Sequence, residues 1–245
     1  MIDRPAALVP DAAVLEVQAD DAVGRGTEKL EPALTRFAID VRGRRALDVG
    51  ASTGGFTQVL LRAGAREVVA VDVGRGQLAE PLARDPRVTS LEGRDIRTVE
   101  PGELGPSFDV IVCDVSFISL TQVLPTLAGL AVVEAPIVVL VKPQFECGRS
   151  ALDRHGVVRS PQHRAAAVVS VAEEGWRSGL RPVAMMPCPV TGAAGNQEYL
   201  LRLDVGTGRS GSTGSLASMS DLHDAVLQDG TWEPPQERPL KGEAP

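Results

Sequence analysis

Lys142 and Asp114 each follow an apolar run that predicts a buried β-strand. Lys142 comes directly after residues 137–141 and is followed by Pro143, and Asp114 comes directly after residues 110–113. Charged side chains are among those least often buried, and a buried ion pair gains little stability because desolvation cancels most of its attraction. If the two strands are neighbours, the pair meets at one edge of a sheet, where it can orient or deprotonate a weak nucleophile. The alternative is a lysine whose stem merely covers a strand end.

A glycine-bearing loop, "LDVGASTGGF" (47–56), lies where the first predicted strand passes into a helix. Its glycines let the backbone turn tightly and approach a ligand at a helix N-terminus. The spacing is neither GxGxxG nor that of a P-loop, so S-adenosylmethionine (SAM) is favoured over a dinucleotide. The residues of this segment that we expect to bind the cofactor are Asp48, Gly50, Ser52, Thr53, Gly54, Gly55 and Phe56.

Carboxylates at successive strand ends complete the predicted cofactor site. Asp72 ends the second strand, where it would accept hydrogen bonds from a ribose diol, and Asp95 follows the third, near the expected adenine. Asp48 suits the ammonium group of SAM. The alternative is an ordinary glycine turn with carboxylates at strand ends, a combination that any α/β protein can have. The other residues expected at the cofactor are Val73, Ile96 and Asp114.

Short β-branched runs alternate with helical patterns along the middle of the chain. This alternation predicts a doubly wound, mostly parallel seven-stranded sheet with helices on both faces, an α/β fold of the Rossmann-like type. The predicted strands are 44–50, 67–73, 87–93, 108–115, 136–142, 181–188 and 197–204. The predicted helices are 28–39, 54–63, 75–84, 119–131 and 161–178.

Composition excludes several classes of protein. The chain has 245 residues and a net charge of −7, without the basic excess of a dedicated nucleic-acid binder. Its three cysteines are far apart and form no CxxC pair, so neither a disulfide framework nor a metal site is predicted. The first residues lack the pattern of a signal peptide and no apolar window could span a bilayer. A cytoplasmic protein without membrane contact is therefore expected.

Five segments in order carry a family resemblance: "ALDVGASTGGF", "VVAVDVGRGQL", "DVSFISL", "VKPQFE" and "GAAGNQEYLL". Together, over about residues 20–205, they resemble the TlyA group of hemolysin-like ribosomal RNA methyltransferases, within the FtsJ-like ribose 2′-O-methyltransferases. The resemblance implies SAM as cofactor and ribosomal RNA or a ribosomal subunit as partner. It also implies a catalytic Lys-Asp-Lys-Glu tetrad, which maps onto Lys29, Asp114, Lys142 and Glu198.

A lysine in that tetrad would position a ribose hydroxyl or act as its general base. Desolvation and the nearby Lys29 would ease deprotonation of Lys142, whereas Asp114 and Glu198 would oppose it and hold the lysines in place. The predicted organisation is an N-terminal extension (1–27), a methyltransferase domain (28–205) and a flexible Gly/Ser/Pro-rich tail (206–245), with at most a short helix at 219–228.

The acceptor stays open between three alternatives. Only about twenty residues precede "GRGTEKL", too few for the family's N-terminal RNA-binding domain, and Glu28 adds negative charge beside Lys29. These features favour a small hydroxylated metabolite, such as a nucleoside-like natural product, whereas the tetrad favours ribosomal RNA. A non-catalytic SAM-binding interaction module is the third alternative.

Two groups of basic residues could still contact RNA, although ordinary surface arginines would look the same in the sequence. One group lies near the first helix and strand and the other in a loop expected to overhang the acceptor site. The first comprises Arg25, Lys29, Arg36, Arg42, Arg44 and Arg45, and the second Arg149, Arg154, His155, Arg159, His163 and Arg164.

Overall fold

A seven-stranded sheet forms the centre of the computed structural model, which describes residues 24–192, 194–206 and 215–234. The strand order is β3-β2-β1-β4-β5-β7-β6, and β7 runs antiparallel to both of its neighbours while the other pairings are parallel. All seven predicted strands are present, and the predicted fold class is confirmed. The strands are β1 (Arg45–Val49), β2 (Glu67–Asp72), β3 (Val88–Glu92), β4 (Val110–Cys113), β5 (Pro136–Val141), β6 (Leu180–Pro187) and β7 (Tyr199–Val205).

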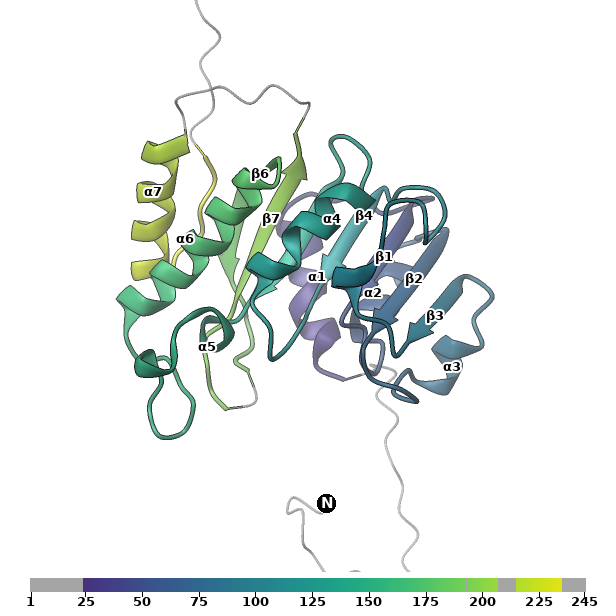
Figure 1. Cartoon of the computed structure of the whole chain (residues 1–245), viewed down its shortest axis with the longest axis horizontal. Coiled ribbons are helices and arrows are strands. Elements are labelled where there is room, and N and C mark those ends of the chain that lie inside the picture. Colours follow the sequence, from purple (N-terminus) through teal and green to yellow (C-terminus); the bar gives the residue numbers. More distant parts are fainter. Residues whose placement is uncertain (1–23, 193, 207–214, 235–245) are drawn as a thin grey trace, which may run out of the picture.

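Helices cover both faces of this sheet (Figure 1). Behind it lie α1 (Gly26–Arg36) and α2 (Gly55–Arg62), and in front lie α4 (Leu124–Leu130) and α6 (Pro161–Arg177). Every residue of β5 is buried, and alternate side chains enter the two apolar layers, as expected for a strand covered on both sides. The sheet is therefore a rigid base whose strand ends position polar groups.

The predicted helix at 75–84 is wrong for most of its length. Only α3 (Glu80–Ala83) is helical, and the residues before it form a loop. The carboxylate of Glu92, at the end of β3, accepts hydrogen bonds from the backbone N–H groups of Gly76, Gln77 and Leu78. These contacts hold the loop in place, and they lower the pKa of Glu92 because each favours the charged form.

The short helix predicted at 219–228 is present as part of a longer one, and the prediction of a flexible tail is corrected for residues 215–234. Helix α7 (Ser215–Leu227) packs against α6 and buries Met219, Leu222 and Val226. Beyond it, the backbone of Trp232 exchanges two hydrogen bonds with Met185 on β6. Burial of the apolar side chains of α7 drives this docking, which the sequence reasoning did not predict. Residues 207–214 and 235–245, like the predicted extension up to residue 23, lie outside the described residues.

No helix in the described part of the chain is long and apolar enough to cross a membrane.

Candidate active site

Lys29, Asp114, Lys142 and Glu198 meet at one end of the sheet. Lys142 Nζ lies 2.6 Å from one oxygen of Asp114, and Lys29 Nζ lies 3.8 Å from the other. Lys29 Nζ also lies 2.8 Å from Glu198 Oε2. The chain path explains this meeting, because Asp114 and Lys142 follow the adjacent strands β4 and β5, while Glu198 precedes β7 and Lys29 lies on α1. The structure thus brings all four predicted residues together.

The cluster is largely removed from water. Lys29, Lys142 and Glu198 are each less than a tenth exposed, and Asp114 is half-buried. Burial lowers the pKa of Lys29, but the charges of Asp114 and Glu198 outweigh burial, so the pKa is raised and Lys29 remains an ammonium. A fixed positive charge at Lys29 therefore ties the two carboxylates together.

Lys142 has a further partner that the sequence did not indicate. Its Nζ donates a hydrogen bond of 2.7 Å to Ser116 Oγ, two residues beyond Asp114. Pro143 begins the short helix α5 (Pro143–Glu146), so the strand ends at Lys142 and the side chain is held at the sheet edge. Lys142 consequently presents its Nζ between a carboxylate and a hydroxyl.

A cavity of about 500 Å³ opens beside the cluster, at the carboxyl ends of β1, β2 and β4. Among the predicted cofactor residues, those that line it are Gly50, Ser52, Asp72, Val73, Asp95, Ile96 and Asp114. Asp48, Thr53, Gly54, Gly55 and Phe56 do not line it. At Gly50, with φ +79°, an added Cβ would lie 2.5 Å from the carbonyl oxygen of Asp114. The absence of a side chain there lets the loop lie directly against the tetrad.

Asp48 lies fully buried beneath that loop. Its Oδ2 accepts a hydrogen bond of 2.6 Å from the Thr57 hydroxyl, while its Oδ1 is buried without a hydrogen-bond partner. Burial raises the pKa of Asp48 to about 7. An unpartnered carboxylate oxygen at this depth is uncommon in folded proteins, and Asp48 lies next to the cavity loop without lining the cavity itself.

Asp72 and Asp95 hold the far side of the cavity. Asp72 accepts hydrogen bonds from the backbone N–H groups of Ser52 (2.8 Å) and Gly74 (2.7 Å), leaving lone pairs for further donors. Asp95 forms an ion pair of 2.6 Å with Arg97, whose hydrogen bonds lower the pKa of Asp95. Asp95 therefore faces the cavity already paired.

Two side chains that the sequence reasoning missed shape the loop after β4. Phe117 is 90% exposed with φ +65°, lines the cavity, and lies against Phe145, with 5.1 Å between ring centroids. Glu146 accepts hydrogen bonds from the Leu120 N–H and the Ser119 hydroxyl, and burial raises its pKa. Both residues lie in segments noted for the family resemblance, "DVSFISL" and "VKPQFE". The sequence alone does not show that these segments touch.

Some of the basic residues predicted to contact RNA are engaged within the fold instead. Arg45 is buried, with an ion pair to Glu67 and a guanidinium above Phe108. Arg164 points inward and donates to the Tyr199 hydroxyl. The prediction that Arg45 and Arg164 contact RNA is wrong, because both side chains make contacts within the fold.

The sheet order, with a polar cluster beside a cavity at the strand ends, is that of a Rossmann-like α/β fold, and the family match assigns the chain to the SAM-dependent methyltransferases. The sequence profile of FtsJ-like methyltransferases matches residues 22–205, and the chain belongs to that family.

Individual relatives agree with this assignment. The 16S/23S rRNA (cytidine-2′-O)-methyltransferase TlyA of Mycobacterium tuberculosis is 49% identical over 226 residues, covering 91% of this chain and 82% of that protein. The 23S rRNA (cytidine-2′-O)-methyltransferase TlyA of Campylobacter jejuni is 34% identical over 193 residues, covering 78% and 74%. A solved structure named "Putative hemolysin from Streptococcus thermophilus" has a TM-score of 0.77 at 35% identity, covering 89% of this chain and 77% of that one.

Proposed function

We propose that this enzyme transfers a methyl group from SAM to a ribose 2′-hydroxyl of ribosomal RNA. The observation that carries the proposal is the buried Lys29–Glu198 pair joined through Asp114 to Lys142, at the rim of the cavity. Two relatives named as rRNA (cytidine-2′-O)-methyltransferases support the same acceptor.

The cavity and its surroundings fit SAM. Asp72 has free lone pairs for ribose hydroxyls, and the unpartnered Oδ1 of Asp48 suits an ammonium group. Gly50 and Ser52 offer a backbone that a ligand can approach closely. These residues would hold the cofactor beside Asp114 and Lys142.

When bound, SAM supplies an electrophilic methyl group on a positively charged sulfur. Lys142 Nζ, held by Asp114, would hydrogen-bond the 2′-oxygen and align it with that methyl group. Transfer of that methyl group to the 2′-oxygen, with loss of its bond to sulfur, would require the hydroxyl proton to leave. A neutral Lys142 takes this proton directly, whereas an ammonium orients the oxygen and the proton passes to water. Lys29 and Glu198 keep Asp114 in place.

The affinity for SAM is expected to depend on Asp48 and on pH. Because burial raises the pKa of the Asp48 carboxyl to about 7, binding an ammonium group below pH 7 must first displace a proton. Affinity should therefore rise by about 15-fold in all between pH 5.5 and 7, and the rise should flatten as pH 7 is approached; the α-ammonium of SAM stays protonated over this range. Calorimetry on Asp48→Asn should give a flat profile, and parallel profiles for the two proteins would remove Asp48 from the cofactor site.

Phe117 is expected to stack on the target base. A side chain exposed at the cavity, in a backbone conformation that is costly for a bulky residue, suits a contact made only with substrate. Stacking on an aromatic ring contributes about 1–3 kcal/mol per base. Phe117→Ala should lower kcat/KM for RNA by about tenfold or more with the melting temperature unchanged, and this loss should exceed any loss of SAM affinity, because Phe117 also lines the cavity. Phe117→Tyr is the matched control, and unchanged kinetics in the alanine variant would exclude stacking.

The acceptor itself is tested by presenting labelled SAM with ribosomal subunits, naked ribosomal RNA and a small-molecule extract side by side. Label in the 2′-position of RNA is expected. Label confined to a small molecule would overturn the proposal and favour a metabolite acceptor.

A further inference from the structure

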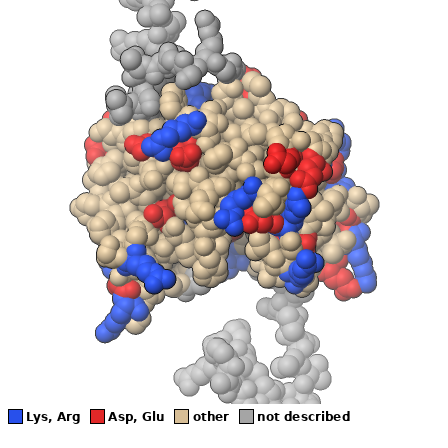
Figure 2. Space-filling view, in the orientation of Figure 1, with Lys and Arg blue, Asp and Glu red and all other residues tan. Residues whose placement is uncertain are grey.

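The loop between α5 and α6 carries a local excess of positive charge on an acidic protein. Residues 149–159 include Arg149, Arg154 and Arg159, all exposed, against a single acidic residue, Asp153. Figure 2 shows Lys and Arg side chains gathered at the lower left, the region where this loop lies in Figure 1. The remainder of that face carries mixed charges, and the whole chain has a net charge of −7. The loop is therefore a local positive surface on an acidic protein.

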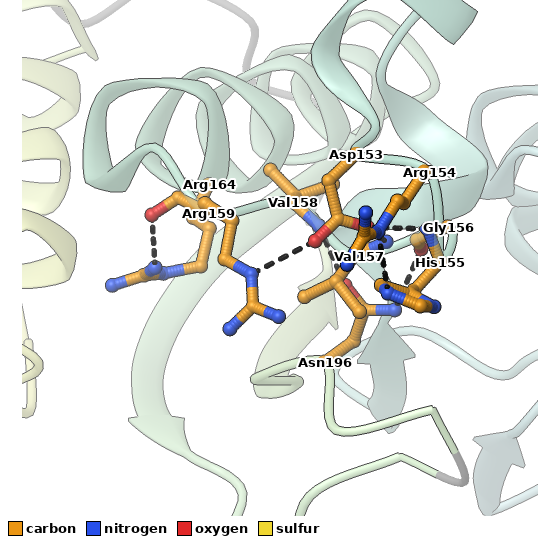
Figure 3. Close-up of polar contacts among 9 residues, drawn as sticks. All are labelled: Asp153, Arg154, His155, Gly156, Val157, Val158, Arg159, Arg164 and Asn196. Carbon is orange, nitrogen blue, oxygen red and sulfur yellow. Dashed lines mark hydrogen bonds and ion pairs between the residues drawn. The ribbon is translucent and has the colours of Figure 1, made fainter.

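A buried asparagine joins this loop to the segment that carries Glu198. Asn196 is only 2% exposed; its Oδ1 accepts a hydrogen bond of 2.9 Å from the Val158 N–H, and its Nδ2 donates one of 3.0 Å to the Gly156 carbonyl (Figure 3). Asn196 lies two residues before Glu198. At its other end the loop follows α5, which begins directly after Lys142. The loop is thus connected by hydrogen bonds to the segment that carries Glu198, and by the chain itself to the segment that carries Lys142.

Internal contacts give the loop a defined shape. The carboxylate of Asp153 accepts hydrogen bonds from the N–H groups of Val157 and His155 and pairs with Arg159 at 2.9 Å (Figure 3). The Val157 N–H and Arg159 lower the pKa of Asp153 to about 2, so it stays charged. Val157 is buried, whereas Arg154 and Arg159 on either side are exposed. The fold thus holds the arginines outward at little further entropic cost on binding.

We propose that the loop of residues 149–159 contacts the RNA backbone next to the nucleotide held at the tetrad, with Asn196 as the positioning residue. The inference rests on the proposed function, which brings a polyanion to this end of the sheet. Guanidinium groups match phosphate oxygens in a two-pronged geometry, and such contacts set the register of a nucleic acid without reading its sequence. The loop thereby supplies phosphate contacts on a protein whose net negative charge otherwise repels RNA.

The test is RNA binding by Arg154→Glu/Arg159→Glu, measured by fluorescence anisotropy with a single-stranded ribosomal RNA fragment across a salt series. Affinity at 0.1 M salt should fall at least tenfold, and the salt slope should decrease by about 1.4, since each phosphate contact on single strands contributes about 0.7. The KM for RNA should rise while kcat and SAM affinity stay unchanged. The matched control is Arg177→Glu/Arg181→Glu, which reverses two exposed arginines at the end of α6 and on β6.

The outcomes separate this inference from the proposed function. Equal losses in both double variants, or unchanged binding in the loop variant while the native enzyme methylates RNA, would overturn the role of the loop alone. Loop-dependent RNA binding without methyl transfer to any RNA would uphold the loop and overturn the proposed function. Loop-dependent binding of an acidic protein, with RNA binding unaffected, would assign the surface to that other partner.

Asn196→Ala tests the positioning role. RNA affinity and salt slope should fall toward those of the loop double variant, and Asn196→Asp, which keeps only the bond from the Val158 N–H, should be intermediate. A lower melting temperature with unchanged RNA affinity of the folded protein would reduce Asn196 to a purely structural residue.

Discussion

Replacing Lys142 with alanine should lower methyl transfer at least a thousandfold while SAM affinity changes less than threefold. The side chain meets Asp114 and Ser116 but does not line the cavity assigned to SAM, so its loss removes contacts to the acceptor and not to the cofactor. General acid–base catalysis contributes about 10²–10⁴ to a rate, and a misplaced hydroxyl lowers the rate further. Single-turnover transfer and calorimetry measure the two quantities separately.

Two further variants separate the roles of Lys142. Lys142→Met keeps the length and apolar stem without the amine and should be as inactive as Lys142→Ala. Lys142→Arg keeps a positive charge that cannot take a proton, so residual activity in this variant measures orientation of the hydroxyl alone. A tenfold loss of SAM affinity with transfer retained would instead assign Lys142 to the cofactor site.

Breaking the buried Lys29–Glu198 pair should cost both stability and activity. Glu198→Leu leaves an ammonium buried with only Asp114 near it, at 3.8 Å, so unfolding should become easier by about 3 kcal/mol. Replacing both partners, as Lys29→Met/Glu198→Leu, should restore most of the unfolding free energy because no uncompensated charge remains. Denaturant titration of the four proteins in this cycle measures the coupling.

Methyl transfer should follow a different pattern across the same cycle. Neither Glu198→Leu nor the double variant should transfer methyl groups. In Glu198→Leu the Lys29 ammonium loses the carboxylate that fixes it, and in the double variant Asp114 loses that ammonium altogether. A stable double variant with native activity would show that the pair serves only the fold. A double variant as unstable as Glu198→Leu would show that the ion pair itself stabilises the protein.

Much of the site could be predicted because strand order determines which strand ends meet. Asp114 and Lys142 follow adjacent apolar runs, so a parallel sheet brings them together. Lys29 and Glu198 are 169 residues apart, and no pattern shows that they touch; only the family resemblance paired them.

Other side chains were missed because their roles depend on loop geometry. Ser116, Glu146 and Asn196 act through hydrogen bonds between loops that are distant in sequence. Likewise, helical periodicity could not show that Glu92 would capture the N–H groups of residues 76–78 and shorten the predicted helix there.

The docked segment after β7 also bears on solubility. Strand β6 is the last strand on its side of the sheet, and such an edge is a template for pairing with another chain. Trp232 occupies part of that edge through its backbone bonds to Met185, while α7 covers apolar side chains of α6. Residues 215–234 therefore cover a sheet edge and an apolar helix face that would otherwise favour self-association. A protein shortened before residue 215 would keep every catalytic residue, and we expect it to aggregate more readily.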